Sequence, residues 1–150
     1  MATYSKDSNG YTLSLTLTEK VNTTANTSDV TYKLVLKSNA SNKYFEQYSI
    51  GYSVSLDGTV RASLARGKTY YAISANGSLT LCSGTATIRH NDDGTKTMPL
   101  AFSIDMASAS YTPGAVSGSG SMKLTDIPRV SSVSATDAYI GGVSTITIAA

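Results

Sequence analysis

The chain contains a single histidine, His90, and two aspartates follow it at Asp92 and Asp93. An imidazole beside two carboxylates is a set of residue types that can transfer protons or bind a cation. A calcium loop would need a further acidic ligand at its far end, and this turn has none. A serine hydrolase would need a nucleophile elbow, and no Gly-x-Ser-x-Gly sequence is present. The sequence therefore favours a solvated turn at these positions over a metal or acid–base site.

Paired carboxylates could hydrolyse a glycoside, but none of the remaining candidates lies in a recognisable motif. These candidates are Glu19, Glu46, Asp57, Asp105 and Asp126. The one cysteine, Cys82, cannot form an intrachain disulfide, and we expect it to be a small buried apolar residue. We therefore expect no enzymatic activity, no metal and no cofactor.

Tyrosine is the dominant aromatic residue, with ten copies against two phenylalanines and no tryptophan. Four tyrosines share the apolar side of alternating segments and are expected in the core: Tyr11, Tyr32, Tyr48 and Tyr52. Others lie near predicted loops, and four of them are candidate glycan-binding residues: Tyr44, Tyr70, Tyr71 and Tyr111. An exposed ring can stack on a sugar while nearby Asn or Asp side chains bind its hydroxyl groups. The alternative is that these rings anchor the core or a subunit interface, where aromatic residues are also enriched.

Alternation of apolar and polar residues, typical of half-buried strands, recurs at residues 11–18, 29–38 and 44–56. Asp57-Gly58 then predicts a tight turn into a strand with Val60, Ala62 and Leu64. Residues 67–74 predict a short strand or a strand-crossing segment. Residues 84–106 predict a β-hairpin, whose turn is Asn91 to Gly94.

Two glycine-containing stretches carry further information. The apolar parity changes after Leu81, which predicts either a β-bulge or a break between strands at Ser83-Gly84, and we prefer a bulge or bend. Val116, Met122 and Leu124 form the apolar face of a last predicted strand. Gly118 and Gly120 fall on the same inward side, so we expect bulky neighbours to pack across them.

Charged residues make up only 15% of the chain, against about 25% in a typical globular domain, and Thr, Ser, Tyr and Gly take their place. With no helical periodicity, we predict an all-β fold, namely an antiparallel β-sandwich of about seven to nine strands. It would be immunoglobulin-like or carbohydrate-binding-module-like. Residues 1–128 form the predicted domain. Residues 129–150 would be a linker and the first strand of a following domain, or an assembly strand.

The net charge of +2 comes from scattered lysines and arginines, which argues against a nucleic-acid partner. The N-terminus lacks the basic and apolar regions of a signal peptide, and no stretch of about 18 apolar residues is present. We expect synthesis in a cytoplasm and no membrane contact.

Two motifs carry a family resemblance: Arg89-His90-Asn91-Asp92-Asp93-Gly94-Thr95-Lys96-Thr97, and the stretch from Val116 to Leu124 that ends in Thr125-Asp126-Ile127-Pro128-Arg129. Their order and separation resemble minor structural proteins in the tails of long-tailed phages (siphophages) of Gram-positive bacteria, over residues 85–148. The resemblance implies a virion structural protein of the tail tip, baseplate or fibre. Its expected partners are other virion proteins or copies of itself in a homo-oligomer. The alternative is a carbohydrate-binding module for host cell-wall polysaccharide; a capsid decoration protein is less favoured.

Overall fold

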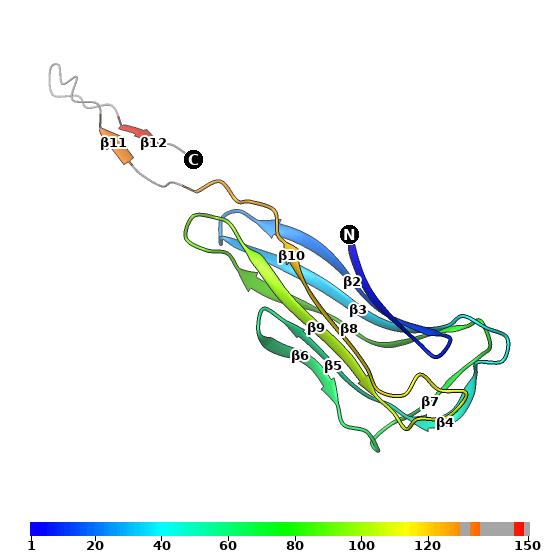
Figure 1. Cartoon of the computed structure of the whole chain (residues 1–150). Coiled ribbons are helices and arrows are strands. Elements are labelled where there is room, and N and C mark those ends of the chain that lie inside the picture. Colours follow the sequence, from blue (N-terminus) through cyan, green and yellow to red (C-terminus); the bar gives the residue numbers. More distant parts are fainter. Residues whose placement is uncertain (130–132, 136–145, 149–150) are drawn as a thin grey trace, which may run out of the picture.

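Two four-stranded antiparallel sheets, packed face to face, form the body of the protein (Figure 1). The computed structural model describes residues 1–129, 133–135 and 146–148. The first sheet has the strand order β1 (Ala2–Ser8), β2 (Tyr11–Asn22), β3 (Thr27–Ser38) and β8 (Ser78–Arg89). The second has the order β10 (Val116–Lys123), β9 (Thr97–Asp105), β5 (Gly51–Leu56) and β6 (Thr59–Leu64). This arrangement confirms the predicted antiparallel β-sandwich.

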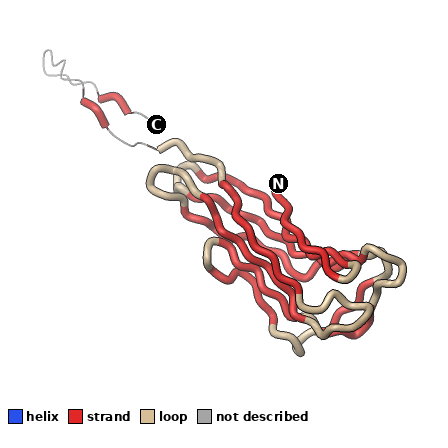
Figure 2. Tube along the Cα trace, viewed as in Figure 1, coloured by secondary structure: helices blue, strands red, loops and turns tan. Residues whose placement is uncertain are grey.

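Two smaller sheets accompany the sandwich. β4 (Phe45–Ser49) pairs with β7 (Tyr70–Ile73), and β11 (Val133–Ala135) pairs with β12 (Ile146–Ile148). Strands β1 to β10 make ten before residue 129, one more than the upper limit of the prediction. Figure 2 shows that the loops gather at the two ends of the long strands. No helix in the described part of the chain is long and apolar enough to cross a membrane.

The core consists of the inward side chains of both sheets, as the alternation of apolar residues predicts. In β2, for example, Leu13, Leu15 and Leu17 are at most 1% exposed, and the threonines and serines between them are more exposed. The second sheet contributes Val54, Leu56, Met98, Leu100, Phe102 and Ile104. Burying each such side chain stabilises the fold by about 1.5–3 kcal/mol.

The N-terminal residues form a strand that the alternation analysis did not predict. Asn9 and Gly10 have φ values of 47° and 82° and make a two-residue turn, in which Ser8 pairs with Tyr11. An Asn-Gly pair favours this left-handed geometry, so the turn signal was present in the sequence. The strand itself is polar because β1 is an edge strand; its Tyr4 hydroxyl donates to the carbonyl oxygen of Ser121 on β10, at 2.8 Å, and so ties the two sheets together.

The predicted strand at residues 44–56 is two strands. β4 and β5 are separated at Ile50, and β4 pairs with β7 outside the second sheet. Gln47 has a φ of 56°, and the register of β4 with β7 shifts between Phe45 and Tyr48. The backbone therefore turns here, and the buried positions change parity, from Phe45 before Gln47 to Ile50 after it. The Asp57-Gly58 turn, with φ values of 58° and 76°, is confirmed.

The predicted β-hairpin at residues 84–106 is wrong. β8 pairs with β3 in the first sheet, and β9 pairs with β5 and β10 in the second. The turn at Asn91 to Gly94 therefore carries the chain from one sheet to the other. β8 and β9, on either side of this turn, face the same core from different sheets. Each strand therefore alternates as the strands of a hairpin do.

The predicted bulge exists, but it lies earlier than Ser83-Gly84. The register between β3 and β8 shifts where Leu34 pairs with Cys82 and Val35 pairs with Thr80, which leaves Leu81 as the extra residue. Gly84 has a different role, because a Cβ atom there would lie 2.5 Å from the hydroxyl oxygen of Tyr32. The parity change and the glycine thus have separate causes.

Bulky residues pack across Gly118 and Gly120, as predicted. A Cβ atom at Gly118 would lie 2.5 Å from the ring of Phe102, and one at Gly120 would lie 3.1 Å from the ring of Tyr4. The strand and linker predicted for residues 129–150 lie largely outside the described residues, so the domain boundary stays a prediction.

Candidate functional site

The four candidate tyrosines lie on or near the β4–β7 sheet and the loop that precedes β10. Tyr44 immediately precedes β4, and Tyr70 and Tyr71 begin β7 opposite Ser49 and Tyr48. Tyr44, Tyr70 and Tyr111 are 56%, 61% and 40% exposed as whole residues. Tyr71 is half-buried against the core, where burial raises the pKa of its hydroxyl.

A depression of about 620 Å³ brings together two of these four tyrosines. Tyr44 and Tyr111 line it, and Tyr70 and Tyr71 do not. Its other lining residues are Asn42, Phe45, Glu46, Tyr48 and Ser110. Tyr48 also lines the depression, although the alternation of apolar residues had predicted that it lies in the core. It is partly exposed and comes directly after the left-handed residue Gln47, a conformation that no residue pattern predicted.

A series of aromatic contacts connects the depression to the core. The ring centroids of Tyr11 and Phe45 lie 6.0 Å apart, those of Phe45 and Tyr48 5.6 Å apart, and those of Tyr48 and Tyr111 5.6 Å apart. The last pair meets edge to face, at 90°. Edge-to-face contacts of this kind are favourable, so Tyr111 is held in a defined orientation although its ring is exposed.

Hydroxyl contacts fix the same side chains. The hydroxyl oxygens of Tyr48 and Tyr111 lie 2.5 Å apart, and this hydrogen bond, together with burial, raises the pKa of Tyr48. The buried Tyr11 hydroxyl donates to the carbonyl oxygen of Tyr111 at 2.6 Å. The backbone and the ring of Tyr111 are therefore both anchored.

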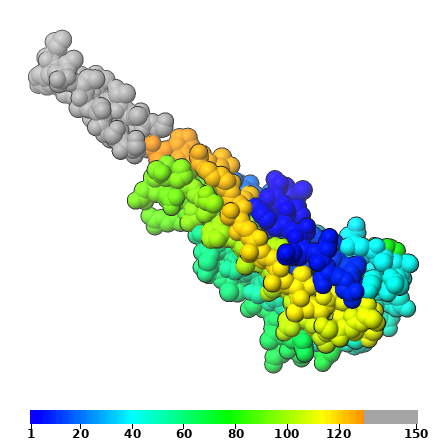
Figure 3. Space-filling view, in the orientation of Figure 1, coloured from blue at the N-terminus to red at the C-terminus, as the bar shows by residue number. Residues whose placement is uncertain are grey.

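Three loops meet around Asn9 to support this end of the protein. The Asn9 amide donates to the carbonyl oxygens of Ala109, Ser110 and Thr112, at 3.3, 3.1 and 2.8 Å. The Lys43 ammonium donates to Asn9 Oδ1 at 3.0 Å and to the Ser110 carbonyl at 2.7 Å. Figure 3 shows the N-terminal hairpin, the segment after β3 and the segment before β10 in contact at one end of the sandwich.

The sequence analysis predicted that His90 belongs to a solvated turn, and this prediction is wrong because the residue is buried. Its side chain is 2% exposed, with Nε2 2.7 Å from Ser28 Oγ and Nδ1 2.8 Å from the carbonyl oxygen of Gly94. Ser28 Oγ donates to Glu19 at 2.5 Å and is itself fully buried. Ser28 and His90 are buried and Glu19 is partly exposed, so these groups form a hydrogen-bond network that extends from the core to the surface.

The acidic residues beside His90 remain at the surface. Asp93 accepts hydrogen bonds from the Thr95 hydroxyl at 2.7 Å and the Thr95 backbone N–H at 3.0 Å, and these bonds lower the pKa of its carboxyl. In the described part of the chain, no group of three or more His, Cys, Asp or Glu side chains is arranged to hold a metal ion. Cys82 is half-buried, and burial raises the pKa of its thiol.

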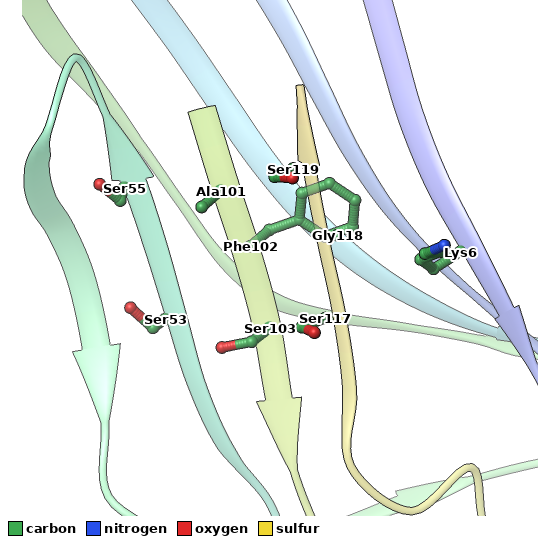
Figure 4. A pocket seen from close by; sticks show the side chains of 9 residues that line it. All are labelled: Lys6, Ser53, Ser55, Ala101, Phe102, Ser103, Ser117, Gly118 and Ser119. Carbon is green, nitrogen blue, oxygen red and sulfur yellow. The ribbon is translucent and has the colours of Figure 1, made fainter. Parts of the chain in front are cut away.

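A second hollow, of about 470 Å³, lies over β5, β9 and β10 (Figure 4). One serine from each strand of the second sheet lies in the same register, so that neighbouring strands pair serine with serine. In the strand order β10, β9, β5 and β6, these are Ser117, Ser103, Ser53 and Ser63. Three of these serines line the hollow, with Lys6 from β1 at its side. Its polar side chains are serine hydroxyls and the Lys6 ammonium.

A family model described as "Siphovirus protein of unknown function (DUF859)" matches residues 1–150, which is the whole chain. The chain belongs to this siphovirus family. The resemblance to siphophage proteins is therefore confirmed at the level of the virus group. No curated protein matched. One solved structure, "Crystal structure of protein from Archaeoglobus fulgidus", is 11% identical, covers 75% of this chain and 96% of its own, and has a TM-score of 0.37. It carries no argument about fold or function.

The two motifs that resembled siphophage tail proteins lie in contact in this siphovirus protein. The backbone N–H of Ile127 donates to the carbonyl oxygen of Gly94 at 3.0 Å, and that of Leu124 donates to Lys96 at 2.9 Å. Gly94 has a φ of 87°, and a Cβ atom there would collide with the Ile127 carbonyl. The turn motif thus forms the surface on which the Ile-Pro-Arg segment lies.

Proposed function

We propose that this siphovirus protein is a non-enzymatic structural component of the virion, placed in the tail tip, baseplate or fibre of a phage of Gram-positive bacteria. There it contacts other virion proteins or copies of itself. The family match over the whole chain supports this proposal. The shape supports it too, because the Ile127–Arg129 segment leaves one end of the sandwich and the β4–β7 sheet lies at the other (Figure 1), where residues of β4 line the tyrosine depression. A module built in this way can be joined at one end and present a surface at the other.

Virion composition tests this role directly. Purified phage particles should contain the protein by mass spectrometry, and gold-labelled antibody should mark the tail by electron microscopy. The mass of the purified protein in solution, with and without residues 130–150, should show self-association or association with tail proteins. Absence from purified particles would refute the structural role. Labelling of the head would replace the tail assignment with capsid decoration.

Binding of host cell-wall glycan at the tyrosine depression is the second candidate function. It is favoured by the meeting of Tyr44, Tyr48 and Tyr111 with the polar side chains of Asn42 and Glu46. Aromatic rings can cover the apolar face of a sugar while amide and carboxylate groups bind its hydroxyls, as in small-molecule sites that combine apolar walls with a few polar groups. The fixed orientation of Tyr111 reduces the entropy lost on binding.

The matched pair Tyr44→Ala and Tyr70→Ala tests this site. Both side chains are exposed to a similar degree, but only Tyr44 lines the depression. Sedimentation with purified host cell walls should be strong for the wild type and Tyr70→Ala, and weak for Tyr44→Ala. If the wild type stays in the supernatant with all host walls tried, glycan binding is excluded.

A further inference from the structure

The charged groups at the tyrosine depression are unevenly distributed. Glu46 is exposed on β4 and is the one ionisable carboxylate among the lining residues. The preceding loop contributes Lys43, but its ammonium is bound to Asn9 Oδ1 and the Ser110 carbonyl, and its stem lies over Gly10. The loop at residues 106–115 contains no Asp, Glu, Lys or Arg. The lining therefore offers the carboxylate of Glu46, whereas the ammonium of nearby Lys43 is held by hydrogen bonds to other groups.

We propose that the depression binds sugar units without negative charge, such as N-acetylated hexosamines, and discriminates against anionic wall polymers. This inference rests on the glycan-binding function proposed for the same site. Tyr44 and Tyr111 would cover the apolar face of the sugar, and Asn42 and Glu46 would bind its hydroxyl and amide N–H groups. Recognition thus combines attraction to the neutral sugar with repulsion of its competitor.

The reason for discrimination is electrostatic. A phosphodiester or carboxylate placed in the depression would lie near the Glu46 carboxylate without an unengaged ammonium or guanidinium group among the lining residues to pair with it. Two like charges about 4 Å apart repel only modestly in water, and salt weakens the repulsion further. Discrimination through Glu46 should therefore be a factor of about five at low salt and should decrease as salt is added.

Isothermal titration calorimetry with two probes tests the proposal: an N-acetylglucosamine tetramer and a poly(glycerol phosphate) of similar length. The wild type should bind the tetramer more tightly than the anionic polymer. Glu46→Gln should bind the anionic polymer about fivefold more tightly than the wild type at low salt. Tyr44→Ala should lose roughly tenfold or more in tetramer affinity, as expected for an aromatic anchor, whereas Tyr70→Ala should match the wild type.

The two levels of the proposal fail in different ways. If the wild type binds poly(glycerol phosphate) as tightly as the tetramer or more tightly, and Tyr44→Ala weakens this, glycan binding stands and the charge preference is wrong. An unchanged affinity for the anionic polymer in Glu46→Gln would remove Glu46 as the cause. If the wild type binds neither probe and does not sediment with host cell walls, the glycan-binding function is wrong, and this inference is wrong with it.

Discussion

Ser28 Oγ lies 2.7 Å from His90 Nε2, and the two side chains are 0% and 2% exposed. The Gly94 carbonyl, 2.8 Å from Nδ1, can only accept a hydrogen bond, so Nδ1 carries a proton. On the far side, Glu19 accepts from Ser28 and from the backbone N–H of Thr125. One hydrogen-bond network, with Ser28 and His90 buried at its centre, therefore joins β2, β3, the turn between the sheets and the segment that follows β10.

Replacing the histidine should weaken the whole protein. His90→Ala leaves the Ser28 hydroxyl and the Gly94 carbonyl short of a partner in a buried place, which should lower the free energy of unfolding by roughly 1–3 kcal/mol. The control is Asp92→Ala in the same turn, whose exposed side chain should matter by less than about 0.5 kcal/mol. Urea unfolding followed by circular dichroism measures both. Equal midpoints for the two variants would show that the network adds nothing.

Glu19 should make stability depend on pH. Partial burial opposes its ionisation, but hydrogen bonds from Ser28 and Thr125 and the charge of His90 outweigh this, so the pKa of Glu19 is lowered from 4.5. A lowered folded-state pKa contributes stability that is complete above pH 4.5 and is lost as the pH falls through the folded value. Glu19→Gln should therefore be less stable than the wild type at pH 7. The difference should shrink below about pH 4.5.

Thr125→Val gives an independent check on this explanation, because it removes the hydroxyl that donates to Glu19 at 2.9 Å and keeps the backbone donor. Its stability deficit should follow the same pH dependence with a smaller amplitude. Thermal unfolding between pH 7 and pH 3 measures both variants. A deficit of Glu19→Gln that stays constant over this range would show that ionisation of this carboxyl is unimportant.

Close packing across Gly84 should be measurable as an energetic coupling with Tyr32. A Cβ atom at Gly84 would lie 2.5 Å from the Tyr32 hydroxyl oxygen and 2.8 Å from Cζ of the ring. Gly84→Ala should therefore cost about 1–3 kcal/mol through overpacking. In a Tyr32→Leu background, the same change should cost clearly less, because the ring is gone. A double-mutant cycle from urea unfolding gives the coupling, and strict additivity would contradict the contact.

The sequence analysis succeeded where a local pattern has only one structural outcome. Alternation identified the inward residues of β2, β3, β9 and β10, because a strand with one buried face must alternate. It could not decide which strands pair. β8 and β9 each face the core, and nothing in their alternation distinguishes a hairpin from a crossing between two sheets. The burial of His90 and its bonds to Ser28 and Gly94 are long-range facts that the turn sequence does not contain.

The candidate site was predictable to a similar degree. Proximity to turn residues correctly indicated that Tyr44, Tyr70 and Tyr111 are exposed. It could not show that Tyr44 and Tyr111 share one depression, because 67 positions separate them. Tyr48 was assigned to the core because it has the spacing of Ile50 and Val54, which follow it, but it belongs to β4 and comes directly after the left-handed residue Gln47. Left-handed conformations at a residue other than Gly, Asn or Asp are uncommon, so no composition rule announces them.

The contact between the turn and the Ile-Pro-Arg segment should make Gly94 much less replaceable than other glycines of similar conformation. Gly94 and Gly58 have φ values of 87° and 76°, so alanine should cost each about 1–2 kcal/mol in backbone conformation. At Gly58 a Cβ atom would meet nothing within 4 Å, whereas at Gly94 it would collide with the Ile127 carbonyl and contact Arg129. Gly94→Ala should therefore lose more stability in urea than Gly58→Ala. It should also speed hydrogen exchange at the Ile127 amide, which donates to Gly94. Equal losses and unchanged exchange at Ile127 would show that the two motifs are not coupled.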